Sequence, residues 1–248
     1  MTRQSYPTEN GVVIRSRVQL SFEESYLRLL RMQNRIYSDA EVRELPKTFF
    51  YNLHRQEWAW REKSMLRILK YLKKVAGPLK VLDLGCGNGW LSSRIAQQQN
   101  REVEAVDVAL YILEQAARLW QMPNVQFHYG RIEEDIFPAK SFDLIVLNQS
   151  IEFFPDLQAL VDRCFYFLKS GGEIHILDSP LYNEKEREAK EKEIHQQFHK
   201  LGIPEMADQY FLHSKNDLQA YQIRYMTKPG PFTRKSQPPH PWVRIICE

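Results

Sequence analysis

The sequence predicts an α/β fold with a doubly wound, mostly parallel, seven-stranded sheet, a C-terminal antiparallel hairpin and an N-terminal helical cap. Between residues 79 and 178, short apolar runs alternate with segments of helical periodicity. This alternation is typical of a parallel sheet with helices on both faces. Beyond residue 220, two more apolar runs flank a stretch with five prolines, which favours a loop over a strand or helix interior.

Residues 1–76 are predicted to form an N-terminal arm followed by a helical cap. The arm is weakly patterned, and its residues 11–20 suit either a short strand or an extended segment. Ser21 and Glu24 have the spacing of a capping box, which predicts the start of a first helix that ends near residue 38. A longer helix is expected over residues 55–75, because apolar side chains recur there at helical spacing.

Residues 77–248 are predicted to form the domain that contains the sheet. Its parallel strands are expected at residues 79–84, 102–107, 125–129, 142–147 and 172–178. The intervening helices are expected at residues 90–99, 109–120 and 157–168. Residues 180–213 depart from the alternation and are expected to form an insertion or lid. Strands at residues 222–226 and 242–246 would close the sheet as an antiparallel edge.

Composition restricts the class of protein. The 34 Lys and Arg residues nearly balance the 31 Asp and Glu residues, so charge does not favour a nucleic-acid binder. The three cysteines (Cys86, Cys164 and Cys247) lack a metal-ligand spacing and favour a reducing, cytoplasmic location. No apolar run approaches the roughly 18–20 residues of a membrane span, and the N-terminus lacks a signal-peptide core. Composition leaves the oligomeric state open.

The segment from Asp83 to Trp90, with the sequence DLGCGNGW, is the loop most indicative of chemistry. Its glycines allow a sharp turn and the close approach of a ligand to the backbone. The loop follows the first predicted parallel strand, and ligands of open parallel sheets bind at this edge. Asp107 ends the next strand, where a carboxylate can accept hydrogen bonds from the hydroxyls of a ribose.

Trp90 and Asp83 indicate which ribose compound this loop would bind. A dinucleotide-binding loop needs a small residue where Trp90 stands, which opposes an NAD-dependent oxidoreductase. No Lys-Ser/Thr pair follows, so the loop is not a P-loop. The charge of Asp83 would repel phosphate and attract a cation. S-Adenosylmethionine combines a ribose with a sulfonium and an ammonium and has no phosphate.

Residues 81–89, VLDLGCGNG, resemble the first motif of class I S-adenosylmethionine-dependent methyltransferases, in the form common among type 11 small-molecule enzymes. The similarity spans about residues 79–178. Its further segments follow in family order and are residues 106–107, 130–134, 141–145 and 168–172. The resemblance implies a Rossmann-like fold, S-adenosylmethionine as the cofactor and methyl transfer as the activity.

The resemblance also implies which residues bind the cofactor. They are Asp83, Gly85, Cys86, Gly87, Asp107, Val108, Ile132, Glu133 and Asn148. The loop backbone would contact the methionine part, with Asp83 near its ammonium and Asn148 near the sulfonium. Asp107 would bind the ribose. Val108 and Ile132 would pack on the adenine. Arg131 replaces an acid that often meets the adenine amino group in relatives, so Glu133, the backbone or water would take that role.

Residues 149–153 bear on metal binding and catalysis. In ubiquinone-pathway relatives this region resembles Glu-x-x-Glu-His and binds a divalent metal. Here it reads QSIEF, in which only Glu152 is a metal-ligand type, so no metal is expected. The Asn/Asp-Pro-Pro-Tyr motif of amino-directed DNA methylases is also absent. Glu152 is a candidate general base, and the competing interpretation is a cap or ion pair at the start of the next helix.

We expect methyl transfer to a small-molecule acceptor, whose methylated atom (O, N or C) the sequence leaves open. The resemblance to class I folds implies that residues 20–76 and 180–213 form the acceptor pocket. Their aromatic residues, among them Phe50, Tyr51 and Tyr210, favour a partly apolar molecule. Two alternatives remain: a regulatory module that holds the cofactor without turnover, and an RNA or protein methyltransferase.

Overall fold

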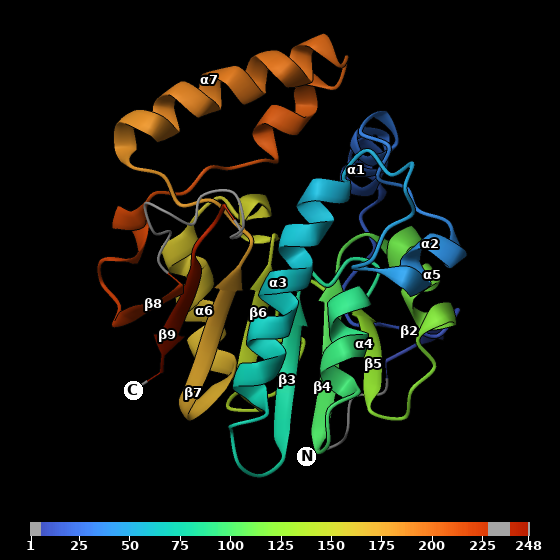
Figure 1. Ribbon diagram of the computed structural model, residues 1–248, viewed down its shortest axis with the longest axis vertical. Coiled ribbons are helices and arrows are strands. Elements are labelled where there is room, and N and C mark those ends of the chain that lie inside the picture. The colour runs from blue at the N-terminus through green and yellow to red at the C-terminus, as the bar shows by residue number, and fades with distance from the viewer. Residues whose placement is uncertain (1–5, 228–238, 248) are drawn as a thin grey trace.

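A nine-stranded sheet forms the centre of the computed structural model, which describes residues 6–227 and 239–247 (Figure 1). Its strand order is β1-β2-β5-β4-β3-β6-β7-β9-β8. The strands are β1 (Thr8–Glu9), β2 (Val12–Ile14), β3 (Leu79–Leu84), β4 (Arg101–Asp107), β5 (Val125–Tyr129), β6 (Phe142–Asn148), β7 (Leu168–Leu177), β8 (Ile223–Thr227) and β9 (Trp242–Ile246). The strands from β2 to β7 in this order are parallel.

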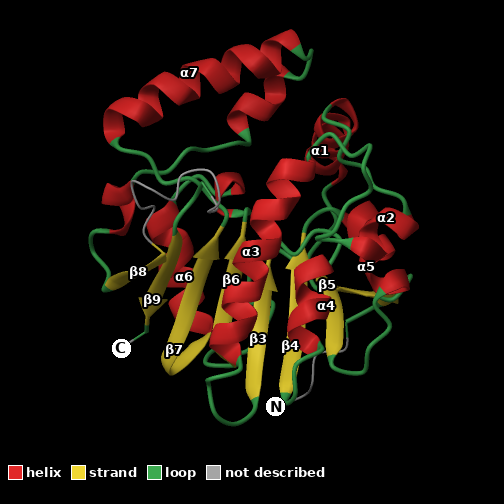
Figure 2. Cartoon of the chain, in the orientation of Figure 1, coloured by secondary structure: helices red, strands yellow, loops and turns green. Residues whose placement is uncertain are grey.

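Helices cover both faces of this sheet (Figure 2). The longer helices are α1 (Leu20–Met32), α2 (Asp39–Glu44), α3 (Arg55–Leu72), α4 (Trp90–Ala96), α5 (Leu110–Leu119), α6 (Leu157–Phe167) and α7 (Glu184–Lys200). Three short 3₁₀-helices are η1 (Ile151–Phe153), η2 (Pro204–Asp208) and η3 (Lys215–Leu218). Within the described ranges, no helix combines the length and apolar character needed to cross a bilayer.

Alternating side chains of β3 divide the core into two layers. Val81 packs in a cluster with side chains of α3, α4 and α5, whereas Leu82 packs in a second cluster with side chains of α6. Both residues are completely buried. This alternation is what the two-residue period of a strand dictates, and it explains why a short apolar run predicts a strand covered on both faces.

The N-terminal arm adds two strands that the sequence analysis did not count. β2 pairs in parallel with β5, and β1 pairs with β2 in the antiparallel sense, so the sheet has nine strands instead of seven. With three residues, β2 is too short to show a periodic pattern. Its pairing instead satisfies backbone groups along an otherwise open edge of the sheet.

The C-terminal hairpin is confirmed, because β9 pairs in the antiparallel sense with both β7 and β8. Most of the proline-rich stretch between its strands (residues 228–238) lies outside the described residues. The capping box at Ser21 is wrong: Gln19 is the N-cap of α1, and it makes no side-chain cap. Ser38 instead begins α2, where it forms a capping box with Glu41.

A layer above the carboxyl edge of the sheet is built from α1, α7 and η2 (Figure 1). Leu29 of α1 packs in one buried cluster with Phe198 of α7 and Met206 of η2. The helix α7 begins with a capping box between Asn183 and Glu186. Segments that are far apart in the chain therefore meet over the strand ends that the glycine loop follows.

Candidate active site

The loop between β3 and α4 turns through three glycines in the left-handed region. The φ angles of Gly85, Gly87 and Gly89 are 75°, 53° and 70°. A Cβ atom on Gly85 would lie 2.3 Å from the Cβ of Ser150, and one on Gly89 would lie 2.6 Å from the ring of Phe127. A Cβ on Gly87 would meet nothing within 4 Å. Packing therefore requires a glycine at positions 85 and 89. The backbone of Gly87 instead faces open space at the cavities.

Asp107, at the end of β4, holds this loop in place. Its Oδ2 accepts a hydrogen bond from the Gly87 N–H at 2.8 Å, and its Oδ1 accepts from Val108 and Ala109 at 2.8 and 3.0 Å. Burial raises the pKa of Asp107 although these three N–H groups lower it. A carboxylate has about four acceptor positions, so one on Oδ2 remains for a further donor.

Two cavities meet at the glycine loop. The β4-side cavity has a volume of about 590 Å³ and includes Asp107 in its wall, and the β6-side cavity has a volume of about 310 Å³ and includes Glu152. Their walls have five residues in common, which are Tyr26, Gly85, Gly87, Gln149 and Phe153. The loop therefore stands at the boundary between two spaces that a single elongated ligand could occupy.

All nine residues that the sequence assigned to the cofactor line one or both cavities. Those of the β4-side cavity alone are Asp107, Val108, Ile132 and Glu133. Those of the β6-side cavity alone are Asp83, Cys86 and Asn148, whereas Gly85 and Gly87 line both. The folded chain thus brings together residues that span 66 positions of the sequence, since Asp83 and Asn148 are its outermost members.

Asp83 is buried beneath the loop. Its Oδ2 accepts a hydrogen bond from the Ser92 hydroxyl of α4 at 2.5 Å. Burial raises its pKa to about 7, in spite of that hydrogen bond. The carboxyl group is therefore partly protonated near neutral pH, and a cation brought close to it would favour the charged form.

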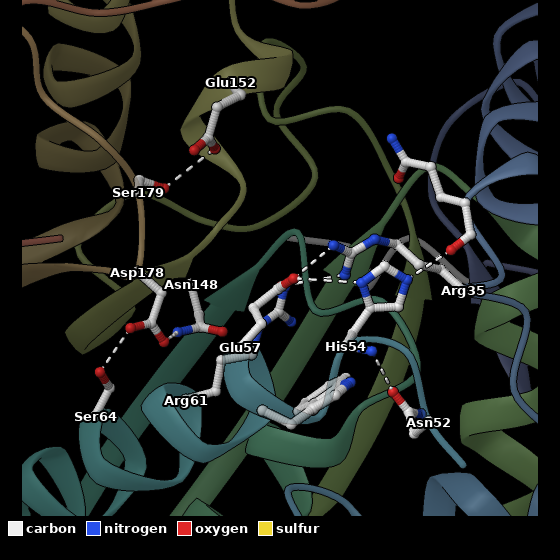
Figure 3. A network of polar contacts seen from close by, with 12 residues as sticks. Arg35, Asn52, His54, Glu57, Arg61, Ser64, Asn148, Glu152, Asp178 and Ser179 are labelled. Carbon is white, nitrogen blue, oxygen red and sulfur yellow. Dashed lines mark hydrogen bonds and ion pairs between the residues drawn. The ribbon is translucent and has the colours of Figure 1, made fainter. Parts of the chain in front are cut away.

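Asn148 and Glu133 line different cavities of the site. The Asn148 side chain donates to Asp178 Oδ2 at 2.9 Å, and Asp178 Oδ1 accepts from Ser64 of α3 at 2.6 Å (Figure 3). The Asn148 side chain is thus used to join β6 to the end of β7. Glu133 is exposed at the wall of the β4-side cavity and forms an ion pair with Arg131 at 3.8 Å.

Glu152 lies in η1 with only 2% of its surface exposed. Its Oε2 accepts from the Ser179 hydroxyl at 3.1 Å, while its Oε1 has no hydrogen-bond partner (Figure 3). Burial raises its pKa to about 7, opposed by Ser179 and by the charge of Arg61. The competing helix-cap interpretation is wrong, because Asp156 caps α6 by accepting from the Ala159 N–H. In the described part of the chain Glu152 has no ion pair.

Sequence reasoning missed a charged cluster in the wall of the β6-side cavity. Arg35 donates to both carboxylate oxygens of Glu57, and Arg61 donates to Glu57 Oε1 at 2.5 Å (Figure 3). Burial of Glu57 raises its pKa, but the two arginines outweigh this effect and hold it at about 2. Glu57 and Arg61 are four positions apart on a predicted helix, so their ion pair could have been predicted from the sequence. The contact with Arg35 has no such spacing.

The aromatic residues expected in the acceptor pocket divide into two groups. Tyr210 lines the β6-side cavity. Phe50 and Tyr51 are 86% and 57% exposed and line neither cavity at the glycine loop, so their assignment to the pocket is wrong. They lie in the connection between α2 and α3. Among residues 6–227 and 239–247, no group of three or more His, Cys, Asp or Glu side chains could hold a metal ion.

Comparison with known proteins finds relatives for the central part of the chain. Residues 81–172 match a family model described as a methyltransferase domain. A ubiquinone biosynthesis O-methyltransferase of Xylella fastidiosa is 36% identical over 101 residues, which cover 39% of this chain and 40% of the relative. A trans-aconitate 2-methyltransferase of Deinococcus radiodurans is 33% identical over 98 residues, which cover 39% and 36%. The chain thus spans about two fifths of the length of these relatives.

The fold agrees with this match. The crystal structure of the CurJ carbon methyltransferase superposes with a TM-score of 0.61 at 12% identity, covering 90% of this chain and 66% of that one. Together with the glycine loop and Asp107, the sequence matches identify residues 81–172 as a methyltransferase domain of the class I S-adenosylmethionine-dependent type. S-Adenosylmethionine is the methyl donor that this family implies.

Proposed function

We propose that this protein transfers a methyl group from S-adenosylmethionine to a small molecule. The observation that supports this most is the position of the glycine loop at the boundary of two cavities, each with an acid beside the loop. Asp107 lines the β4-side cavity, and Asp83 lines the β6-side cavity. The names of the two relatives, which refer to ubiquinone biosynthesis and trans-aconitate, favour a small acceptor over a macromolecule.

The residues of the site fit the cofactor. The remaining acceptor position of Asp107 suits a ribose hydroxyl, and the apolar side chains of Val108 and Ile132 line the same cavity for an adenine ring. Asp83 suits an ammonium group on the other side of the loop. Gly87 exposes its backbone between them, where a side chain would obstruct the ligand.

Glu152 is the residue that we assign to proton transfer. When bound, the cofactor supplies a methyl group that is already activated, so the protein has to position the acceptor, exclude water and accept a proton. Glu152 Oε1 has no hydrogen-bond partner and lines the β6-side cavity, where it can accept the proton of an acceptor O–H or N–H group. A carboxyl pKa of about 7 is well matched to this task near neutral pH.

Calorimetric titration with S-adenosylhomocysteine tests the cofactor site. Asp107→Ala should weaken binding by about 10–100-fold, because hydrogen bonds to a charged group contribute about 1.5–3 kcal/mol. Asp135→Ala, which removes an aspartate whose side chain is 74% exposed, should bind like the unmodified protein. Absence of binding by the unmodified protein, or equal heats for Asp107→Ala, would contradict the proposal. Binding without methyl transfer to any acceptor of a broad panel would favour the regulatory-module alternative.

A further inference from the structure

The cluster formed by Arg35, Glu57 and Arg61, here called the guanidinium cluster, has an unequal charge. Two guanidinium groups share one carboxylate, and both arginines line the β6-side cavity. The exposed fractions of the three side chains are 21%, 25% and 12% in this order. A half-buried site with one cation in excess favours an anionic occupant, because removing an uncompensated charge from water is costly.

Arg61 retains binding capacity after its contact with Glu57. Its Nε is buried without a hydrogen-bond partner, and its guanidinium lies 4.5 Å from the ring centre of Trp58. A planar guanidinium stacked on an aromatic ring is held in a fixed orientation, which is suited to binding a carboxylate through two N–H groups. The side chain is therefore positioned for a ligand rather than free in solvent.

Three further acids, which line the β6-side cavity or are hydrogen-bonded to its wall, are held by other partners in the described part of the chain. Asp83 accepts from Ser92, and Asp178 accepts from Ser64 and Asn148. Glu152 accepts from Ser179, and it lies within the electrostatic influence of Arg61 without forming an ion pair. Among the described residues, Glu57 is the only acid that forms an ion pair with Arg61.

The position of α3 indicates which part of the site this cluster serves. Ser64, one turn after Arg61, donates to Asp178 at the end of β7. In the sheet, β6 and β7 lie on one side of β3, while β4, which ends in Asp107, lies on the other. Arg61 therefore lies on the opposite side of the glycine loop from Asp107. Glu152 lines the cavity on the same side as Arg61.

We propose that the acceptor is a small carboxylic acid whose carboxylate binds the guanidinium cluster while its nucleophilic group faces Glu152. This inference rests on the methyltransferase function proposed above. A singly charged carboxylate balances the cluster, which then contains two cations and two anions. Apolar walls from Phe153 and Phe198 would surround the body of the molecule. In the reaction, the nucleophile's lone pair forms the new bond to the methyl carbon, the electrons of the broken C–S bond remain on sulfur, and Glu152 receives the proton.

Paired ligands that differ only in charge test this inference. A panel of hydroxylated aromatic and aliphatic carboxylic acids, each with its primary amide, is measured by thermal shift and titration in saturating S-adenosylhomocysteine. We expect at least one acid to bind the unmodified protein about 10–100-fold more tightly than its amide. Arg61→Gln should abolish this preference, whereas Arg55→Gln, which removes an exposed charge from the same helix, should retain it.

A second variant protects the test from a folding defect. Glu57→Gln keeps both guanidiniums and removes the acid that they share, so the preference for acids over amides should increase. Equal binding of acids and amides by the unmodified protein, or a preference that survives Arg61→Gln, would overturn the inference. A loss of S-adenosylhomocysteine affinity in Arg61→Gln with the acid preference intact would instead assign the cluster to the cofactor's own carboxylate. Failure of the unmodified protein to bind S-adenosylhomocysteine would refute the proposed function itself.

Discussion

The two cavities differ in where the chain supplies their distinctive residues. The β4-side cavity takes Asp107 and Val108 from the end of β4 and Ile132 and Glu133 from the turn after β5. The β6-side cavity takes its guanidinium cluster from the segment after α1 and from α3, and further wall residues from α7. The family model covers residues 81–172, which include the first set and exclude the second. The guanidinium cluster and the α7 wall therefore lie outside the matched range, whereas the four residues named for the β4-side cavity lie inside it.

The largest expected effect is a loss of catalytic rate that leaves the affinity for the cofactor unchanged. Glu152→Gln should lower kcat by about 10²–10⁴-fold, the range that general-base catalysis provides. Its affinity for S-adenosylhomocysteine should be unchanged, since Glu152 is not among the residues that we assign to the cofactor and does not line the β4-side cavity proposed for the nucleoside. Glu188→Gln, which changes an exposed acid of α7, is the matched control. An unchanged kcat in Glu152→Gln would show that Glu152 does not accept the proton. The proposed functional difference between the two cavities would then have no support.

The same substitution should raise the stability of the protein above pH 7, although it lowers kcat. Because burial raises the folded-state pKa of Glu152 from 4.5 to about 7, its contribution to stability is present below about pH 4.5 and is lost as the pH rises through about 7. Above pH 7, Glu152→Gln should therefore be more stable than the unmodified protein by roughly 1–3 kcal/mol. Denaturant titrations at pH 5 and pH 8 measure this difference. A lower stability of the variant at both pH values would show that the carboxylate is well stabilised in the folded protein.

Two glycines of the loop provide the next comparison. Gly85→Ala should destabilise the protein by roughly 2–5 kcal/mol, because its Cβ would clash with Ser150 in a left-handed backbone. Gly87→Ala meets no neighbour within 4 Å and should cost only about 1–2 kcal/mol, yet it should weaken S-adenosylhomocysteine binding. Denaturation and titration of both variants test this division. Unchanged binding by Gly87→Ala would show that the ligand does not approach the loop there.

The last comparison is the pH profile of the unmodified protein. A base with a pKa of about 7 must be ionised to act, so kcat should rise about tenfold per pH unit below pH 7 and level off above it. The affinity for S-adenosylhomocysteine should follow a different profile, which depends on Asp83 and Asp107. Rates measured from pH 5 to pH 9 at saturating substrate test this expectation. A rate that is constant over this range would contradict proton transfer to Glu152.

Local patterns were sufficient to predict the central sheet and the strand ends that meet at the glycine loop. Asp83 and Asp107 lie among the last two residues of adjacent strands, so the predicted strands were enough to bring their positions together. The contact between Arg35 and Glu57 depends instead on how a segment without periodicity packs on α3, and no local pattern encodes that packing. Ser21 had the correct capping-box spacing but lies inside α1, because the helix begins before it. Short motifs thus predicted the residues that lie at adjacent strand ends. The contact between Arg35 and Glu57 depends on tertiary packing and was therefore not predicted.

A crystal structure of the complex with S-adenosylhomocysteine tests the central claim most directly. The account predicts that the ribose hydroxyls lie at Asp107 Oδ2, with the adenine between Val108 and Ile132 in the β4-side cavity. The amino-acid part should extend over Gly87 toward Asp83, leaving the space between Arg61 and Glu152 for the acceptor. A nucleoside bound anywhere other than the β4-side cavity, or a complex in which side chains occlude the glycine loop, would contradict it.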